Sequence, residues 1–360
     1  MDVFCCNTKI ISGTGAVSAL AEFGAGKVFL VSDPYFVKNG TADRVLAATK
    51  AQYTEVFDGV QPDPSVELAA EGTAKLKKFE PDLVVALGGG SAIDCAKAMR
   101  FFAGEKNIFA AIPTTSGSGS EVTDFAILTY GETKHPLVDP KLRPDAAILD
   151  DELLAQLPKS LIADSGFDVL SHALEACAAT DSGTITDCLA KEAFVCAFNM
   201  LPLSYAGQTQ VRLKVHEASC LAGMAFTQAG LGICHALAHA LGGMFHIPHG
   251  RLNAVLLPAV VGVNSSAAGR KYAEFAKAAG VGGGADTIIV RNLKNSLVRL
   301  RRQLNLPDTL IQAGADAKIL RSRQGEIIKT ALQDPCCRTN PVPVTESLLK
   351  QVLDEVTGRG

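Results

Sequence analysis

Residues 83–98 read LVVALGGGSAIDCAKA, and this stretch decides the fold class. An apolar run with the length of one strand ends at three glycines, and a segment typical of a helix follows. Glycines let the backbone approach another group closely, and the N–H groups at the start of a helix attract an anion. The stretch therefore predicts a strand, a phosphate-binding turn and a helix in succession.

The same alternation fills the first part of the chain. The β-rich runs cover residues 27–33, 53–57, 82–90 and 108–113, and helical segments are expected near 40–50, 64–79 and 91–103. A hairpin is expected over 125–140, and one more strand with a short helix over 146–158. Strand–helix alternation predicts a parallel, Rossmann-like sheet with helices on both faces.

The second part of the chain has a different pattern. From about residue 159 nearly every window has 3.6-residue periodicity, which predicts an all-α domain. We therefore expect an α/β domain over 1–158 and a helical domain over 159–360. The segment 281–286, VGGGAD, is expected to be a loop between helices.

Composition excludes several classes of protein. The 360 residues are 48% hydrophobic and 20% charged, with a net charge of -3, which does not favour binding to nucleic acid or an anionic membrane. The sequence has no apolar run near the ~20 residues that span a bilayer, and the start MDVFCCNTKI lacks the layout of a signal peptide. These features predict a cytoplasmic protein.

The ten cysteines are expected to be free thiols. The sequence has no CxxC, and several cysteines occur singly in apolar stretches, where each is expected to be a small buried hydrophobe: Cys95, Cys177, Cys188, Cys196 and Cys220.

A second glycine-rich turn follows a strand at 111–126, AIPTTSGSGSEVTDFA. It offers hydroxyls and backbone N–H groups together, and the apolar runs on both sides argue against a flexible linker. Because neither turn matches G-x-G-x-x-G or the P-loop pattern, a dinucleotide fits better than a nucleoside triphosphate. Asp33, at the end of the first long strand, can accept hydrogen bonds from ribose hydroxyls, although an Asp-Pro turn is an equal alternative.

Histidines and one aspartate form helical pairs in the second half. Asp168 and His172 are four residues apart, and so are His235 and His239, which brings each pair to one side of a helix. His249 follows a proline in an expected loop, and the glycines at 242–243 offer a helix end. Alone, an Asp-His pair is more often hydrogen-bonded than metal-bound. Together, nitrogen and oxygen ligands suit Zn²⁺ or Fe²⁺.

These residues resemble the iron-containing (group III) alcohol dehydrogenases, within the wider dehydroquinate synthase-like and glycerol dehydrogenase-like fold. The resemblance covers nearly the whole chain. It rests on GGGSAIDCAKA, PTTSGSGSEVT, GFDVLSHALEA, HALAHALGGMFHIPHGRLNAVLLP and NPVPVT.

The resemblance implies a role for each matching residue. The metal ligands would be Asp168, His172, His235 and His249, and His239 would face the substrate. Asp33 matches the acidic residue that accompanies a preference for NAD. The other expected cofactor contacts are Gly88, Gly89, Gly90, Ser91, Asp94, Thr114, Thr115, Ser118 and Lys134.

The chain departs from the family pattern at a few positions, none of them a ligand. Phe167 replaces a common Met, Cys177 a frequent aromatic residue, and NPV the more usual NPR. Asp164, one turn before Asp168, is expected to cap the helix, and His246 to line a pocket or lie in the interior.

The implied reaction is the reversible oxidation of a small primary alcohol to an aldehyde with NAD⁺ and Fe²⁺, or Zn²⁺ in its place. Phe167 and Phe245 favour a small, partly apolar pocket that suits ethanol, 1-propanol or 1,3-propanediol. Two alternatives are a dehydroquinate synthase-like lyase and a non-catalytic metal- or nucleotide-binding protein. The resemblance also implies a homodimer and, through the short-alcohol branch, an association with a bacterial microcompartment.

Overall fold

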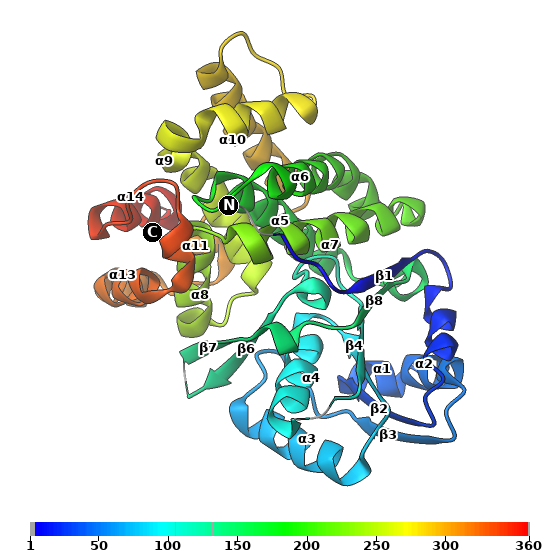
Figure 1. Cartoon of the computed structure of the whole chain (residues 1–360). Helices are drawn as coiled ribbons and strands as arrows, with labels where there is room; N and C mark the ends of the chain where they lie inside the picture. The colour runs from blue at the N-terminus through cyan, green and yellow to red at the C-terminus, as the bar shows by residue number, and fades with distance from the viewer. Residues whose placement is uncertain (1–3, 105, 132, 359–360) are drawn as a thin grey trace. The chain divides into compact units, whose positions relative to one another are not determined.

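The computed structural model describes residues 4–104, 106–131 and 133–358. The chain divides into two compact units with a boundary between Leu157 and Pro158 (Figure 1). We call residues Cys6–Leu157 the sheet unit. The residues from Pro158 onward, together with Phe4 and Cys5, form the helical unit.

A six-stranded sheet, parallel throughout, forms the centre of the sheet unit, in the order β1-β8-β5-β4-β2-β3. Its strands are β1 (Lys9–Ser12), β2 (Lys27–Ser32), β3 (Tyr53–Phe57), β4 (Leu83–Gly88), β5 (Ile108–Pro113) and β8 (Ala146–Leu149). A separate antiparallel hairpin comprises β6 (Phe125–Tyr130) and β7 (Thr133–Val138). The expected Rossmann-like sheet is confirmed.

Helices cover both faces of this sheet. They are α1 (Pro34–Lys38), α2 (Thr41–Thr49), α3 (Val66–Phe79) and α4 (Gly90–Ala103), with short 3₁₀ segments η1 (Ala16–Phe23), η2 (Ser120–Val122), η3 (Pro140–Leu142) and η4 (Asp151–Leu154).

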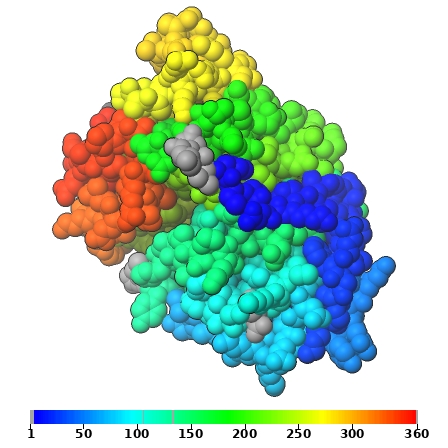
Figure 2. Space-filling view, in the orientation of Figure 1, coloured from blue at the N-terminus to red at the C-terminus, as the bar shows by residue number. Residues whose placement is uncertain are grey.

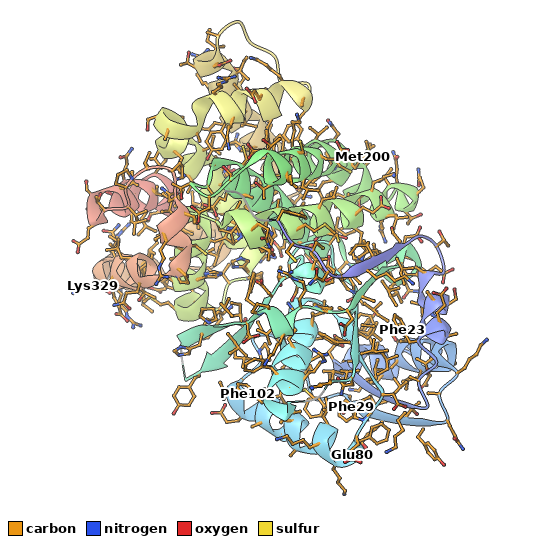
Figure 3. The ribbon with its side chains drawn as sticks, viewed as in Figure 1. Phe23, Phe29, Glu80, Phe102, Met200 and Lys329 are labelled. Atoms are coloured by element: carbon orange, nitrogen blue, oxygen red, sulfur yellow. The ribbon has the colours of Figure 1, made fainter. Side chains whose placement is uncertain are left out.

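Alternate residues of the central strands supply two hydrophobic cores. Val28 and Leu30 of β2 pack in the core with η1 and α2, whereas Phe29, labelled in Figure 3, packs in the core with α3 and α4. Since side chains alternate across a strand, a strand buried on both faces is a continuous apolar run, as residues 83–87 are.

The helical unit contains the rest of the regular structure. Its helices are α5 (Lys159–Ala178), α6 (Thr184–Tyr205), α7 (Arg212–Ala229), α8 (Ile233–Phe245), α9 (His249–Ala278), α10 (Asp286–Gln303), α11 (Leu310–Ala313), α12 (Ala317–Ser322), α13 (Gln324–Gln333) and α14 (Glu346–Thr357), with η5 (Thr209–Val211) and η6 (Pro335–Thr339). The loop expected at 281–286 joins α9 to α10 and forms the yellow tip of this unit in Figures 1 and 2.

One helix of this unit is long and apolar enough to cross a membrane. In α9 the most apolar window has a mean hydropathy of 1.4, and 67% of that window is buried within the protein. Core helices of folded domains pass the same test, so this burial explains the apolar sequence.

Several local expectations are wrong. The glycines at 242–243 lie inside α8, which ends at Phe245 because His246 adopts a left-handed conformation with φ 52°. His249 begins α9 and does not lie in a loop. All ten cysteines are free, as expected, but Cys188 is exposed and Cys196 only partly buried.

Candidate functional site

Three of the four expected metal ligands converge in the helical unit. Asp168 on α5, His235 on α8 and His249 at the start of α9 each place one ligand atom within 4.8 Å of the other two. Asp168 Oδ1 lies 3.8 Å from His235 Nε2 and 3.6 Å from His249 Nε2. Two ligands of a tetrahedral Zn²⁺-type site lie about 3.4 Å apart, so this spacing fits one divalent cation.

The charge of Asp168 also favours the binding of a cation. Burial by itself would raise the pKa of Asp168, but the neighbouring imidazoles of His172, His249 and His235 and a hydrogen bond from Asn253 hold that pKa below its ordinary value. Asp168 therefore stays an anion at neutral pH. A buried carboxylate beside two imidazoles is a donor set that suits Fe²⁺ or Zn²⁺.

The fourth expected ligand, His172, lies beside this cluster. Its ring stacks between those of Phe226 and His235, with centroid distances of 4.3 Å and 4.5 Å. The group of mutually close ligand atoms does not include His172. Its role as a ligand stays a prediction.

Two residues that the sequence analysis missed hold the ligands. Asn253 Nδ2 donates to Asp168 Oδ1 over 2.7 Å and lies 3.3 Å from His235 Nε2 and 3.1 Å from His249 Nε2. Glu175 Oε2 lies 2.6 Å from His235 Nδ1. A sequence signal existed for both, since Glu175 is two turns after Asp168 on α5 and Asn253 one turn after His249 on α9.

His239 also has a partner that the sequence analysis missed. Its Nδ1 lies 2.7 Å from Asp334 Oδ2, and its ring stacks on that of His249 with centroids 5.1 Å apart. Although burial opposes it, the hydrogen bond and the charge of His239 lower the pKa of Asp334 to about 2. The ionised Asp334 favours a proton on Nδ1 and leaves Nε2 as the acceptor.

Three other expectations near this cluster are wrong. Asp164 lies within α5 and does not cap it. It forms an ion pair with Arg251 through two hydrogen bonds, and Arg251 Nη2 is 2.9 Å from Asp164 Oδ2. Phe167 is fully buried, so it packs in the core and does not line a pocket. His246 is exposed at the end of α8, so its expected place in the interior is wrong, and its place in a pocket lining stays a prediction.

In the sheet unit, the glycine-rich turns meet at the carboxyl ends of neighbouring strands. Gly88 has φ +153°, and a Cβ there would lie 2.6 Å from that of Ala92, so only glycine fits. Cβ atoms at Gly89 and Gly90 would lie 3.2 Å from the Thr115 hydroxyl and 3.0 Å from the Ser118 side chain. The two turns are thus in contact, and Thr114 N donates to the Gly88 carbonyl.

The N-terminus of α4 is open to an anion. No side chain caps it, and Gly89, Gly90 and Ser91 there are only partly buried. Asp33 lies at the end of the adjacent β2, where Oδ1 caps α1 by accepting from Tyr35 N and Phe36 N. Its Oδ2 is directed towards Gly88, 3.7 Å from where a Cβ would be.

Two expected cofactor contacts have other partners. Asp94 is buried, where it accepts hydrogen bonds from the Ser120 hydroxyl and from Ile127 N, so it supports the turn from within. Burial raises the pKa of Asp94 despite the nearby Lys97. Lys134 forms an ion pair with Asp63, with Nζ 2.6 Å from Oδ1.

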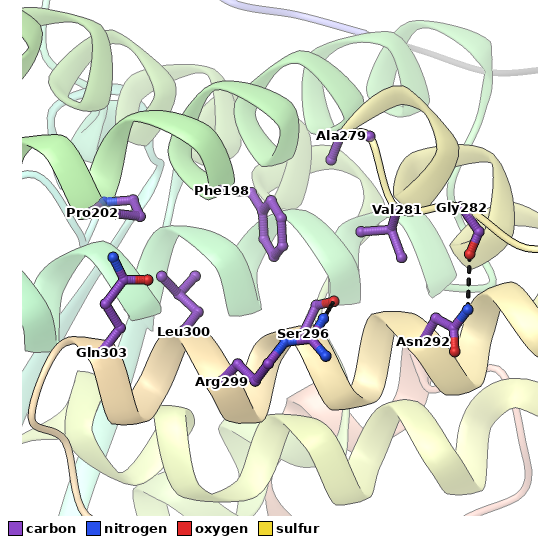
Figure 4. A pocket seen from close by; sticks show the side chains of 11 residues that line it. Phe198, Pro202, Ala279, Val281, Gly282, Asn292, Ser296, Arg299, Leu300 and Gln303 are labelled. Atoms are coloured by element: carbon purple, nitrogen blue, oxygen red, sulfur yellow. Dashed lines mark hydrogen bonds between the residues drawn. The ribbon is translucent and has the colours of Figure 1, made fainter.

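A hollow of about 530 Å³ lies elsewhere in the helical unit, between α6, α10 and the loop that joins α9 to α10 (Figure 4). None of the expected ligands lines this hollow. The residues that line it are Phe198, Pro202, Ala279, Gly280, Val281, Gly282, Asn292, Ser296, Arg299, Leu300 and Gln303. Arg299 is the one charged side chain among them, and it hydrogen-bonds to Ser296. This lining does not suit metal chemistry.

Known proteins resemble the chain along its full length. The family described as iron-containing alcohol dehydrogenase matches residues 7–151, and the C-terminal part of the Fe-containing alcohol dehydrogenase family matches residues 162–357. The NADPH-dependent butanol dehydrogenase of Clostridium saccharobutylicum is 37% identical over 96% of the chain and 95% of the relative. The 1-propanol dehydrogenase PduQ of Salmonella typhimurium is 36% identical over 99% of the chain and 100% of the relative.

Solved structures have the same fold. A 1,3-propanediol oxidoreductase superposes with a TM-score of 0.93 at 30% identity, covering 99% of this chain and 100% of that one. A sulfoacetaldehyde reductase of Bifidobacterium kashiwanohense in complex with NAD⁺ superposes with a TM-score of 0.89 at 26% identity, covering 100% of both chains.

Proposed function

The chain belongs to the iron-containing alcohol dehydrogenase family, and we propose that the Asp168 cluster is its metal site. As a member of that family, it is a metal-dependent oxidoreductase that transfers a hydride between a nicotinamide cofactor and an alcohol–aldehyde pair. The ligands are Asp168, His235 and His249, with His172 as the fourth. The observation that carries this proposal is the convergence of the first three from separate helices on one point.

A metal held there supplies Lewis acidity, which lowers the pKa of an alcohol hydroxyl. The residues of the chain supply the rest. Asp168 provides the negative charge that retains the cation, and His239 takes the hydroxyl proton on Nε2, because Asp334 holds its Nδ1. When bound, NAD⁺ would accept the hydride of the alcohol carbon, and His239 would pass the proton to solvent.

We place the cofactor in the sheet unit. Gly88, Gly89, Gly90 and Ser91, at the uncapped start of α4, would hold the pyrophosphate, with Thr114, Thr115 and Ser118 beside it. Asp33 Oδ2 disfavours a 2′-phosphate, which makes NAD the preferred cofactor. Lys134, which is paired with Asp63 in this structure, would contact the nucleotide.

A neutral substrate fits the helical unit better than the phosphorylated acid of the lyase alternative. The segments 165–177 and 232–250 contain no Lys or Arg, and the Arg251 charge is paired with Asp164. These segments therefore offer no unpaired cationic side chain, next to the proposed ligands, that could bind an anionic substrate. Small alcohols such as 1-propanol are therefore the proposed substrates.

The direct test is NADH formation with 1-propanol by Fe²⁺-loaded protein, compared with Asp168→Asn. We expect wild type to form NADH and to retain one metal per chain, and Asp168→Asn to lose both. Asp181→Asn, on an exposed turn, is the matched control and should behave as wild type. Metal-loaded protein that forms no NADH with any short alcohol would favour the lyase or the non-catalytic binder.

Assembly and location are further parts of this proposal. The resemblance implies a homodimer associated with a microcompartment, and the composition predicts a cytoplasmic location. The similarity to PduQ over 99% of the chain supports the short-alcohol branch. Light scattering behind a sizing column should give twice the mass of the chain.

A further inference from the structure

Glu175 is a buried carboxylate that contacts both a metal ligand and the helix that carries it. Only 2% of this residue is exposed. Its Oε1 accepts from Cys234 N over 2.7 Å, and its Oε2 lies 3.3 Å from His235 N and 2.6 Å from His235 Nδ1. Each carboxylate oxygen therefore faces at least one N–H group of α8.

The ring contact determines which nitrogen of His235 is available. Because a carboxylate oxygen can only accept, the contact between Oε2 and Nδ1 favours a proton on Nδ1. Nε2 is then unprotonated, and Nε2 is the atom that faces Asp168 Oδ1. We propose that Glu175 is a positioning residue that fixes the tautomer and orientation of His235, and so sets the metal affinity of the site. This inference rests on the proposed metal site.

A simpler alternative is that Glu175 only caps α8. The helix begins at Ile233 after Gly232, which has no capping side chain, so other residues satisfy its first N–H groups. Asn340 accepts from Ile233 N through Oδ1 and is bonded to Asn264, and within the described part of the chain it makes no hydrogen bond to the His235 ring. Asn340 and Glu175 therefore share the capping role, and Glu175 alone adds the ring contact.

Substitution by glutamine cannot preserve both the ring contact and the cap. The Gln side chain has one oxygen and one NH₂ group, so one of them must face Nδ1 and the other the Cys234 N–H. If the NH₂ faces Nδ1, the ring proton moves to Nε2, which then cannot bind a metal. If the oxygen faces Nδ1, the NH₂ opposes the Cys234 N–H. Either arrangement weakens the site.

The test measures Zn²⁺ affinity of metal-stripped protein by competition with a chromophoric chelator. Removal of the partner of a metal-bound histidine costs about 10–100-fold in affinity, and we expect that loss for Glu175→Gln. Asn340→Ala should lower Tm but retain Zn²⁺ affinity. Unchanged affinity in Glu175→Gln, or equal losses in both variants, would overturn the inference.

A second measurement needs no variant. In Zn²⁺-loaded wild type with ¹⁵N-labelled histidines, His235 should bind the metal through Nε2 and carry a proton on Nδ1. Zn²⁺ on Nδ1 would overturn the role of Glu175 while leaving the metal site intact. Wild type that binds Zn²⁺ no better than Asp168→Asn would overturn the proposed metal site, and this inference with it.

Discussion

At the scale of single residues, Asp33 uses its two carboxylate oxygens differently. Oδ1 caps α1, and Oδ2 is directed towards the glycine turn. Asn caps a helix as well as Asp does but carries no charge. In Asp33→Asn we therefore expect an unchanged Tm. The ratio of kcat/KM for NADP⁺ to kcat/KM for NAD⁺ should rise by at least about tenfold, because the variant loses about 1.4 kcal/mol of charge repulsion towards the 2′-phosphate. A constant ratio would show that Asp33 is only a cap.

Asp334 allows a similar separation of charge from capping. It caps η6 by accepting from Cys336 N through Oδ1, while Oδ2 holds His239. Asp334→Asn keeps the cap and removes the charge beside the imidazole. We expect kcat to fall by at least about tenfold, because general acid–base catalysis contributes about 10²–10⁴-fold. KM for NAD⁺ should not change, and an unaltered kcat would remove His239 from the proton pathway.

Lys97 predicts a pH dependence of stability. It is fully buried with four acceptor contacts, to Ser120 Oγ, the two oxygens of Thr123 and the Phe125 carbonyl, and burial lowers its pKa to about 8. Between pH 8 and 10.5 the unfolded chain still holds a proton that the folded protein has lost. Stability from this group therefore rises with pH in that window, by up to about 3 kcal/mol.

Urea unfolding of wild type and Lys97→Met at pH 7.5 and 10 measures this effect. The free energy of unfolding of wild type, relative to that of Lys97→Met, should increase as the pH rises. Lys77→Met, at an exposed position on α3, should show no such change relative to wild type. A difference between wild type and Lys97→Met that does not vary with pH would contradict the prediction.

The residues that sequence reasoning found and missed differ in one physical respect. Asp168, His235 and His249 belong to patterns within one helix or loop, and such spacing can be recognised locally. The bond between His239 and Asp334 joins residues 95 positions apart. Glu175 lies two turns after Asp168 on α5, but its bond with His235 joins residues 60 positions apart. Only tertiary packing brings these partners together.

At the scale of elements, the close approach of α5 and α9 sets the ligand spacing. A Cβ at Gly250 would lie 2.0 Å from the Asp164 carbonyl oxygen, so the two backbones are in contact. Gly250→Ala must move α9 away from α5, and with it His249 from Asp168. We expect Zn²⁺ affinity to fall and the free energy of unfolding to fall by about 1–3 kcal/mol, as overpacking does.

Gly269→Ala is the control on the same helix. No atom of the described residues lies within 4 Å of a Cβ there, so the substitution should leave Zn²⁺ affinity unchanged and add roughly 0.5–1 kcal/mol of stability through helix propensity. Gly250→Ala with wild-type metal affinity would show that the helix contact does not set the ligand spacing.

The elements also show where sequence patterns are informative. The apolar runs of β2, β4 and β5 and the hairpin were predicted within a residue or two, because buried strands need continuous apolar sequence. The edge strand β1 was not predicted, since its four residues are largely exposed and carry no such pattern. The predicted end of α8 was wrong because α8 ends where His246 adopts a left-handed conformation, and a histidine gives no sequence signal for that conformation.

At the scale of the whole molecule, we propose that the boundary near residue 158 separates two binding functions. Metal binding should slow amide hydrogen exchange in α5, α8 and α9, and NAD⁺ should slow it in residues 88–98 and 111–123, because ligands stabilise the state that binds them. Hydrogen exchange with mass spectrometry would show this. Protection by Zn²⁺ confined to the sheet unit would contradict the division.

We propose that one metal in the Asp168 cluster supports alcohol oxidation, and an activity titration tests this role most directly. Metal-stripped wild type is titrated with Fe²⁺ without oxygen, while NADH formation from 1-propanol and NAD⁺ is followed by absorbance. We predict a rate that rises from background to a plateau at one Fe²⁺ per chain. A full rate before any Fe²⁺ is added, or a rate that Fe²⁺ does not change, would contradict the account.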